Sequence, residues 1–372
     1  MRATLRVPGT RRILADRQWA ERHLAFAIPG DLEAPTGGYG YDRRLMDELR
    51  ALGWEIEHIA LPGGFPSPSD AERGQALAAL TALPLGTPLM IDGLAFGVMD
   101  REAPQLAARG PLIALVHHPL ANETGLAADH ARALRASEWA ALSHAGRVVV
   151  TSPATATALT RDFEVAAERI VVAVPGTDPA AFARGSGGPG VQLIAVGSLI
   201  PRKGHLDLLA ALEELRALDW WLDLVGDPGL DPAHAAEIVA AIHRYALSER
   251  VALHGPLGRA ELDALYDSAD IFVLASHYEG YGMAYAEGIA RGLPVVGTTG
   301  GAIAETVGAA GELVPPGHPR ALAGVLAKLI ADPAHRARRA EAARAAAPLL
   351  PTWADTARRV ADAIASTGEA TS

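Results

Sequence analysis

Cysteine is absent from this sequence of 372 residues, so disulfides and thiolate metal sites are excluded. Long apolar runs are absent as well, and none approaches the roughly 20 residues that a membrane-spanning helix needs. The first residues carry several arginines but no apolar core, which is not the pattern of a secretory signal. These absences favour a cytoplasmic protein with at most peripheral contact with a membrane.

Charged residues make up only 20% of the chain, and acidic ones prevail, giving a net charge of -10. This balance argues against a nucleic-acid binder that works by neutralising phosphates. The sequence has no Asp-x-Asp motif and no histidine pair at the spacing of a metal-binding helix. We therefore predict neither a metal site nor a bound cofactor.

Lysine is also scarce, because only two of the 33 basic residues are lysines, Lys203 and Lys328. A compact ammonium and a planar guanidinium are not equivalent around a phosphate. Lys203 stands beside a glycine and is therefore a candidate for a specific role.

What the chain does contain is a regular alternation of apolar, strand-like runs with helical segments. We predict strands at 23–28, 54–59, 89–92, 112–116, 148–151 and 170–174, separated by helices at 41–52, 70–82, 101–108, 128–144 and 153–161. After a glycine-rich linker at 185–190, strands are predicted at 191–196, 221–225, 251–254, 271–275, 294–297 and 311–314. The helices of this second series are predicted at 205–217, 232–246 and 260–268, then up to about 291, at 320–330 and at 334–348.

Strands that alternate with helices imply right-handed crossovers and a parallel sheet covered on both faces. We therefore predict an α/β protein with two Rossmann-like domains. The predicted division is an N-terminal extension at 1–20, a first domain at 21–184, a second domain at 185–350 and a C-terminal helix at 351–372. That helix begins at Trp353 and is expected to dock back on the first domain.

The stretch from Ser276 to Gly288 follows a buried-type strand and contains two carboxylates eight residues apart, Glu279 and Glu287. Glycines at 280 and 282 allow a tight turn and close approach of a ligand to the backbone. Glu287 stands among apolar residues, where a carboxylate is costly to bury without a hydrogen-bond partner. A ligand's hydroxyls would serve, and so would a nearby arginine or backbone amide.

Ligands bind at the carboxyl ends of the strands in such sheets, and three further segments are predicted there. The cluster Gly37–Gly40 is predicted to be a loop that offers amides to an anion, although a plain turn also explains it. His117 and His118 follow a buried strand, and one of them is expected to be structural. Arg202 and Lys203 precede a helix, where two cations favour a diphosphate, although the spacing is not that of a P-loop.

Together these segments resemble the retaining, nucleotide-sugar-dependent glycosyltransferases of family 4, which have the GT-B fold. The resemblance rests on Glu279-x7-Glu287 and is supported by Gly37-Gly38, His117, Arg202-Lys203-Gly204, Gly226-Asp227 and Gly300-Gly301, in that family's order. It covers nearly the whole chain after about residue 21. It implies two domains whose sheets face each other across a cleft. It also implies transfer of a hexosyl group from a nucleotide-diphosphate sugar to a sugar, lipid or small-molecule acceptor.

The resemblance implies a catalytic group and a donor-binding group. The catalytic residues would be His117, with His118 as the alternative, together with Glu279 on the transferred sugar and Lys203 on the leaving diphosphate. Donor-binding residues would also include Glu287 on the ribose, the amides near Gly282 and Met283, and Gly37, Gly38, Ser198, Arg202 and Leu257. Ser198 stands where the family commonly has arginine, so Arg202 is expected to supply the missing charge.

With no metal motif, the resemblance implies that Lys203, Arg202 and helix N-termini neutralise the diphosphate, and that the anomeric configuration is retained. A hydrolase with Glu279 and Glu287 as its paired carboxylates is discounted, because nothing places them on opposite sides of a glycosidic bond. Three other functions stay open: an epimerase of the same fold, a nicotinamide-dependent oxidoreductase and a non-catalytic sugar-nucleotide module. The incomplete GxGxxG pattern at 37–40 speaks against the oxidoreductase.

Overall fold

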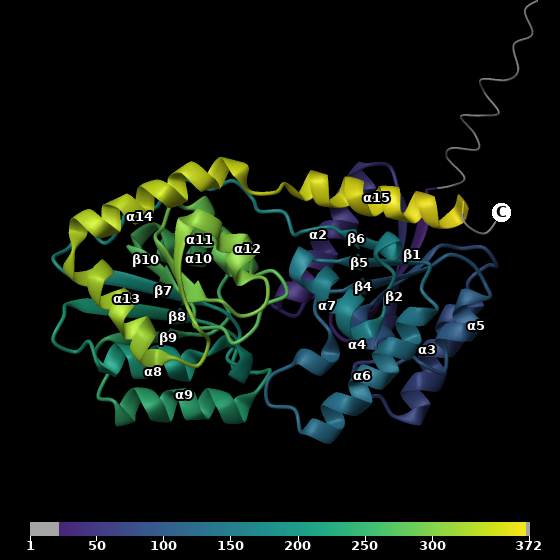
Figure 1. The fold of residues 1–372 in the computed structure, drawn as a ribbon, viewed down its shortest axis with the longest axis horizontal. Coiled ribbons are helices and arrows are strands. Elements are labelled where there is room, and N and C mark those ends of the chain that lie inside the picture. The colour runs from purple at the N-terminus through teal and green to yellow at the C-terminus, as the bar shows by residue number, and fades with distance from the viewer. Residues whose placement is uncertain (1–21, 370–372) are drawn as a thin grey trace, which may run out of the picture.

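The computed structural model describes residues 22–369 as two α/β domains that lie side by side (Figure 1). Each domain contains a six-stranded sheet in which the paired strands run parallel. The prediction of two Rossmann-like domains is confirmed. The predicted extension at 1–20 lies outside the described residues.

The first sheet has the strand order β2-β1-β3-β4-β5-β6. Its strands are β1 (His23–Pro29), β2 (Glu55–Leu61), β3 (Leu89–Asp92), β4 (Leu112–Val116), β5 (Arg147–Val150) and β6 (Ile170–Val172). Its helices are α2 (Gly37–Ala51), α3 (Asp70–Ala82), α4 (Gly93–Phe96), α5 (Ala103–Ala107), η1 (Leu120–Asn122), α6 (Ala128–Ser143), α7 (Pro153–Phe163) and η2 (Ala167–Arg169).

The second sheet has the order β12-β11-β10-β7-β8-β9. Its strands are β7 (Val191–Val196), β8 (Trp220–Val225), β9 (Val251–His254), β10 (Ile271–Val273), β11 (Val295–Thr298) and β12 (Gly311–Val314). Its helices are η3 (Pro201–Lys203), α8 (His205–Glu213), α9 (Pro232–Arg244), α10 (Arg259–Ser268), α11 (Met283–Ala290), α12 (Ile303–Val307), η4 (Gly308–Ala310), α13 (Pro319–Ala331), α14 (Pro333–Ala346) and η5 (Ala347–Leu349).

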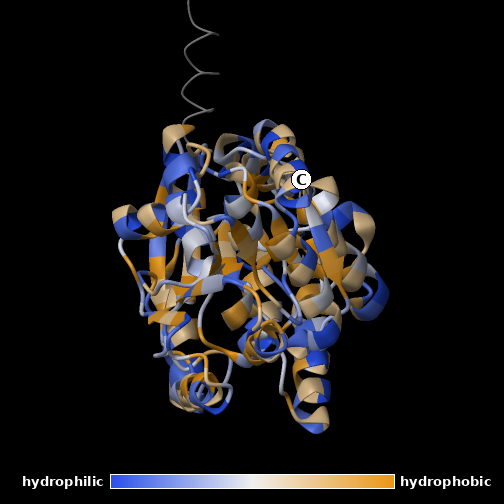
Figure 2. Cartoon of the chain, turned by 90° about the vertical axis from the view of Figure 1, so that its left-hand side faces the viewer, coloured by the Kyte–Doolittle hydropathy of each residue, from blue (hydrophilic) through white to orange (hydrophobic). Residues whose placement is uncertain are grey.

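Both faces of each sheet are buried, which explains why the strands read as continuous apolar runs. In β1, Ala25 and Ala27 join the core beneath α3, α4 and α6, whereas Phe26 and Ile28 join the core beneath α2 and α15 (Trp353–Glu369). Figure 2 shows the same arrangement as apolar strands enclosed by helices with polar outer surfaces. The parallel strands therefore end together at one edge of each sheet, where loops lead into the helices.

After α14 the chain crosses back from the second domain, and the C-terminal helix α15 packs against α2, β5 and β6 of the first (Figure 1). Its buried residues Trp353, Ala357, Val360 and Ile364 recur at helical spacing and belong to the first domain's core. The chain passes between the domains twice at one place, where the amide of Thr177 donates to the carbonyl of Pro351 at 2.8 Å.

One local prediction is wrong: Gly37–Gly40 is not a loop but the first turn of α2. The hydroxyl of Thr36 caps this helix by accepting a hydrogen bond from the amide of Tyr39 at 3.3 Å. Such a cap offsets the low helix propensity of glycine. In the described part of the chain, no helix is both long and apolar enough to cross a bilayer.

Candidate active site

The carboxyl edges of the two sheets meet, and the predicted site residues lie at this contact. Gly280 of the second domain packs directly on the first domain, since a Cβ added there would lie 2.1 Å from the carbonyl oxygen of His117. The amide of Ala154 donates to the carboxylate of Glu305 across the same boundary at 3.1 Å. Residues that follow β4 and β5 of the first sheet and β10 and β11 of the second are thereby brought to one place.

Glu279 is a buried anion held by two cations. Its carboxylate accepts from Lys203 Nζ at 2.7 Å and from Arg202 Nη1 at 3.2 Å. The hydroxyl of Ser276 donates a third bond at 2.7 Å. Burial alone would raise the pKa of Glu279, but Lys203 and Arg202 outweigh it and lower that pKa to about 2. The side chain is therefore ionised at every physiological pH.

The turn that carries the two cations owes its shape to a glycine. The chain forms η3 over Pro201–Lys203 and then adopts a left-handed conformation at Gly204, with φ of 65°. A Cβ on Gly204 would lie 2.0 Å from the carbonyl oxygen of Ala275, so no larger residue fits. This close approach places Lys203 beside the Ser276–Glu279 turn.

Arg202 donates hydrogen bonds to residues of both domains. Its Nε donates to Glu123 of the first domain at 3.1 Å, while its Nη1 donates to the carbonyl of Tyr278 at 3.0 Å. Glu123 also lies 3.3 Å from His118 Nε2, and these partners lower the pKa of Glu123 to about 2 although burial opposes the shift. Ser198 lies half-buried before this turn and supplies no charge.

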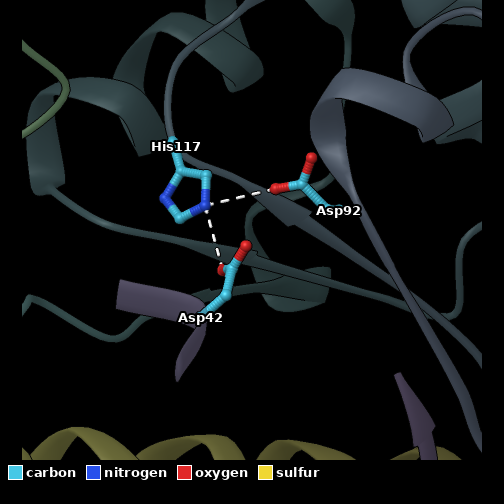
Figure 3. Close-up of side chains that lie close together, drawn as sticks. All are labelled: Asp42, Asp92 and His117. Atoms are coloured by element: carbon cyan, nitrogen blue, oxygen red, sulfur yellow. Dashed lines mark hydrogen bonds and ion pairs between the residues drawn. The ribbon is translucent and has the colours of Figure 1, made fainter. Parts of the chain in front are cut away.

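His117 follows β4 and is held by two carboxylates that the sequence analysis did not identify (Figure 3). Its Nε2 lies 3.2 Å from Asp42 Oδ1 and 3.2 Å from Asp92 Oδ2. Asp42 comes from α2 and Asp92 from the end of β3, and their exposed fractions are 0% and 1%. The other ring nitrogen, Nδ1, points away from both carboxylates (Figure 3).

These contacts decide the charge of His117. Burial alone would lower its pKa, but the charges and hydrogen bonds of Asp42 and Asp92 outweigh burial and raise that pKa to about 10. At neutral pH the ring is therefore an imidazolium, which donates hydrogen bonds and does not accept a proton. Burial raises the pKa of Asp42, and the imidazolium limits that rise.

The same three side chains are, among the described residues, the one group whose ligand atoms lie close enough to hold a metal ion, within 4.8 Å of one another. The distances of 3.2 Å from Nε2 to both carboxylates also fit direct hydrogen bonds. We refer to Asp42, Asp92 and His117 as the carboxylate-histidine triad.

Glu287 lies on α11, and among the described residues its carboxylate accepts one hydrogen bond, donated by the hydroxyl of Tyr266 at 3.1 Å. Burial raises the pKa of Glu287, and Arg291 and Tyr266 offset only part of that rise. The guanidinium of Arg291 lies 4.1 Å from the centre of the Tyr266 ring, so the tyrosine that binds Glu287 is itself fixed. A half-satisfied carboxylate of this kind is suited to accept bonds from ligand hydroxyls.

The remaining predicted donor residues lie at the same edges. Gly38 is adjacent to His117, since a Cβ added to Gly38 would lie 3.5 Å from the imidazole ring. Gly282 caps α11 with φ of 98°, and Met283, the first residue of that helix, packs against the first domain's core. Gly37 begins α2, and Leu257 follows β9.

Asp42, Asp92 and Glu123 are the site residues that sequence reasoning missed. Asp92 had a usable signal, since it ends the buried strand β3 and such positions face the ligand side of the sheet. A hollow of about 500 Å³ lies elsewhere, at the amino ends of β8 and β9 beside Trp221 and Arg250, and is not part of this site.

Solved structures with the same arrangement identify the class of fold. Sucrose-phosphate synthase from Thermosynechococcus elongatus superposes with a TM-score of 0.78 over 94% of this chain and all of that chain, at 22% identity. Anabaena Alr3699/HepE in complex with UDP-glucose superposes with a TM-score of 0.72 over 92% of this chain and 99% of that chain, at 19% identity. The chain has the GT-B fold.

The family follows from sequence comparison. Residues 181–346 match the family described as Glycosyl transferases group 1. The MMP alpha-(1->4)-mannosyltransferase of Mycolicibacterium hassiacum is 31% identical over 266 residues, 67% of this chain and 64% of that protein. The chain spans less than two thirds of the length of this mannosyltransferase, and less than two thirds of the length of two D-inositol 3-phosphate glycosyltransferases that it also matches. The segment 181–346 therefore belongs to the group 1 glycosyltransferases, and the predicted resemblance to glycosyltransferases with the GT-B fold is confirmed.

Proposed function

We propose that this protein is a retaining glycosyltransferase that moves a hexosyl group from a nucleotide-diphosphate sugar to an acceptor hydroxyl, without a metal ion. The observation that carries the proposal is the group Lys203, Arg202 and Glu279, which lies against the loop of His117 at the contact of the two domains. Two cations beside an anionic side chain can bind a diphosphate and a sugar hydroxyl together. The UDP-glucose in a protein of the same fold supports this kind of donor.

Each part of the site has a task in this proposal. Lys203 and Arg202 neutralise the departing diphosphate, whose charge grows as the bond to the sugar breaks. Glu279 accepts hydrogen bonds from the sugar, and Glu287 accepts them from the ribose. The imidazolium of His117 donates to the sugar and adds positive charge on the first-domain side. Retention is inferred from the family 4 resemblance, with the leaving phosphate oxygen taking the acceptor's proton.

The first test is binding and turnover in the presence of EDTA. Calorimetric titration with UDP, GDP and ADP is expected to show saturable binding of at least one nucleotide, and the matching hexose donor is expected to release that nucleotide. NMR of the product reports whether the anomeric configuration is retained.

The chain offers a matched control, because its two lysines can be replaced separately. Lys203→Ala is expected to lower the turnover number by about 100-fold or more, whereas Lys328→Ala on the exposed side of α13 should leave it unchanged. Loss of activity in EDTA, inversion, binding of NAD(H) in place of these nucleotides, or an epimerised sugar with no transfer would each contradict the proposal.

A further inference from the structure

The carboxyl edges of the two sheets differ in charge. The edge at which the strands of the first sheet end is called the first edge, and that of the second sheet the second edge. The first sheet's loops at 30–36, 62–69, 117–127 and 151–152, all within the described part of the chain, contain neither lysine nor arginine. They do contain acidic residues, namely Asp31, Glu33 and Glu123, and β3 ends in Asp92. By contrast, the single loop 197–204 of the second sheet contains both Arg202 and Lys203.

The acidic residues of the first edge converge. The hydroxyl of Tyr39 donates to the carbonyl of Pro29 at 2.7 Å, at the end of β1. Burial, followed by the charges of Asp92, Asp42 and Asp31, raises the pKa of this hydroxyl to about 12. Because three carboxylates act on this half-buried hydroxyl, they contribute a negative potential at this edge close to His117.

The helix starts at this edge, which could otherwise bind an anion, are already occupied by carboxylates. Glu72 closes the capping box of α3, Asp92 accepts from the amide of Leu94 at 2.9 Å to cap α4, and Glu305 takes the amide of Ala154 in α7. The first turn of α6 carries Asp129. The start of α2 remains, and its Gly38 lies beside His117, where the proposed function places the donor.

Arg43 and Arg44 of α2 are bound within the protein, as is Arg202 of the second domain, which donates to Glu123 at this edge. Arg43 donates to the backbone carbonyls of Leu32 and Ala34 and thereby fixes the 30–36 loop. Arg44 makes two parallel bonds to Asp178, at 2.7 and 2.9 Å. A phosphate monoester is bound by a free guanidinium, an ammonium or a helix start. Among the residues that the structure describes, this edge offers neither a free guanidinium nor an ammonium.

We propose that the acceptor is an uncharged sugar or polyol that carries no phosphate group, an inference that rests on the proposed function. In the reaction, the acceptor oxygen forms a bond to the anomeric carbon as the bond from that carbon to the phosphate oxygen breaks. The nucleoside diphosphate leaves with the electron pair, and the acceptor's proton passes to it. The acidic first edge would repel a phosphorylated acceptor and accept hydrogen bonds from neutral hydroxyls.

The test uses matched acceptors with the full chain and the donor that its nucleotide binding identifies. Three pairs are compared: fructose with fructose 6-phosphate, myo-inositol with inositol 1-phosphate, and mannose with mannose 6-phosphate. We expect kcat/KM to be at least about 10-fold higher for the unphosphorylated member of any pair that is used. A higher value for the phosphorylated member would overturn the inference.

A second measurement decides the case in which no pair is used. With the donor site saturated by the nucleoside diphosphate, calorimetric titration with the same phosphate monoesters is expected to give no saturable heat up to millimolar concentration. Saturable binding would overturn the inference. Failure of the proposed function is seen separately, as the absence of nucleotide binding before any acceptor is added.

A charge variant shows whether this edge is responsible. Glu33→Lys, at an exposed position in the 30–36 loop, should raise binding or use of the phosphorylated compounds several-fold. Asp362→Lys, on the exposed side of α15, makes the same change of charge elsewhere. An equal rise in both variants would show that overall charge decides, and would overturn the inference.

Discussion

The two domains place opposite charges at their contact, and in each of them one charged side chain is held by two side chains of the opposite charge. In the first domain a partly buried cation, His117, is held by two carboxylates; in the second a buried anion, Glu279, is held by two cations. Each group therefore has one charge in excess, negative in the first and positive in the second. Buried charges with two partners keep their ionised form and their orientation, because the unpaired state is far more costly.

The contrast assigns different work to the two edges. The second edge has the excess positive charge that a diphosphate requires, and the bridge from Arg202 to Glu123 joins it to the first. The first edge has fixed acceptors and a single imidazolium, an arrangement that orients hydroxyl groups. The predictions below alter one member of the pair at a time.

The largest effect is expected for Glu279→Ala. It leaves Lys203 and Arg202, both partly buried, beside each other without their shared anion, which costs about 3–5 kcal/mol of unfolding free energy. Urea unfolding measures this loss, and nucleotide release should fall by about 100-fold or more.

Glu123→Ala is the matched control for Glu279→Ala, since it removes the other, more exposed partner of Arg202. It should cost less than about 1 kcal/mol. Equal losses in the two variants would show that Glu279 is not the principal partner of the cations.

The helices and strands could be predicted from the sequence where the residues that determine them are close together in the chain. Strands such as Leu112–Val116 and Val191–Val196 were predicted with their observed bounds, because they are apolar runs bounded by glycine, proline or histidine. Gly37–Gly40 was predicted wrongly, because the cap at Thr36 decides the conformation and glycine propensity does not.

The candidate site divides in the same way. Arg202, Lys203 and Glu279 lie in short motifs, so their pattern pointed to one site, and the structure brings them together. Asp42 is 75 residues from His117 in the chain, and only the packing of α2 against the first sheet makes them neighbours. No periodicity or spacing reports such a contact.

The second prediction breaks the contact between the domains. Gly280→Ala places a Cβ 2.1 Å from the carbonyl oxygen of His117, so the second-domain turn must move away. We expect turnover to fall by about 10- to 100-fold through misplacement of the reacting groups, with the unfolding free energy of each domain little changed. Small-angle scattering should detect a more open chain.

Gly324→Ala, in α13 with no atom near the added Cβ, is the control. It should stabilise the helix by up to about 1 kcal/mol and leave turnover unchanged. Full activity in Gly280→Ala would show that the domains do not react in this closed arrangement.

The third prediction tests the charge of His117. Its folded pKa of about 10 lies above the ordinary histidine value, so its contribution to stability is fully present below about pH 6.5 and is lost as the pH rises toward 10. NMR titration of the imidazole should show this high pKa, and Asp42→Asn should lower it. Asp47→Asn, on the exposed face of α2, should leave it unchanged. A wild-type ring that titrates near pH 6.5 would contradict the triad.

The smallest effect on stability is expected for Glu287→Gln, which sharpens the contrast within the Glu279-x7-Glu287 motif. Burial raises the pKa of Glu287, so its ionised form destabilises the fold, and that cost grows as the pH rises above the ordinary glutamate value. The variant should therefore be as stable as the wild type at pH 4 and slightly more stable at pH 7. Its affinity for the nucleotide should fall by about 10-fold, because an amide is a weaker acceptor for the ribose hydroxyls. Tighter nucleotide binding in the variant would place the ribose elsewhere and leave Glu279 as the only ligand-binding carboxylate of the pair.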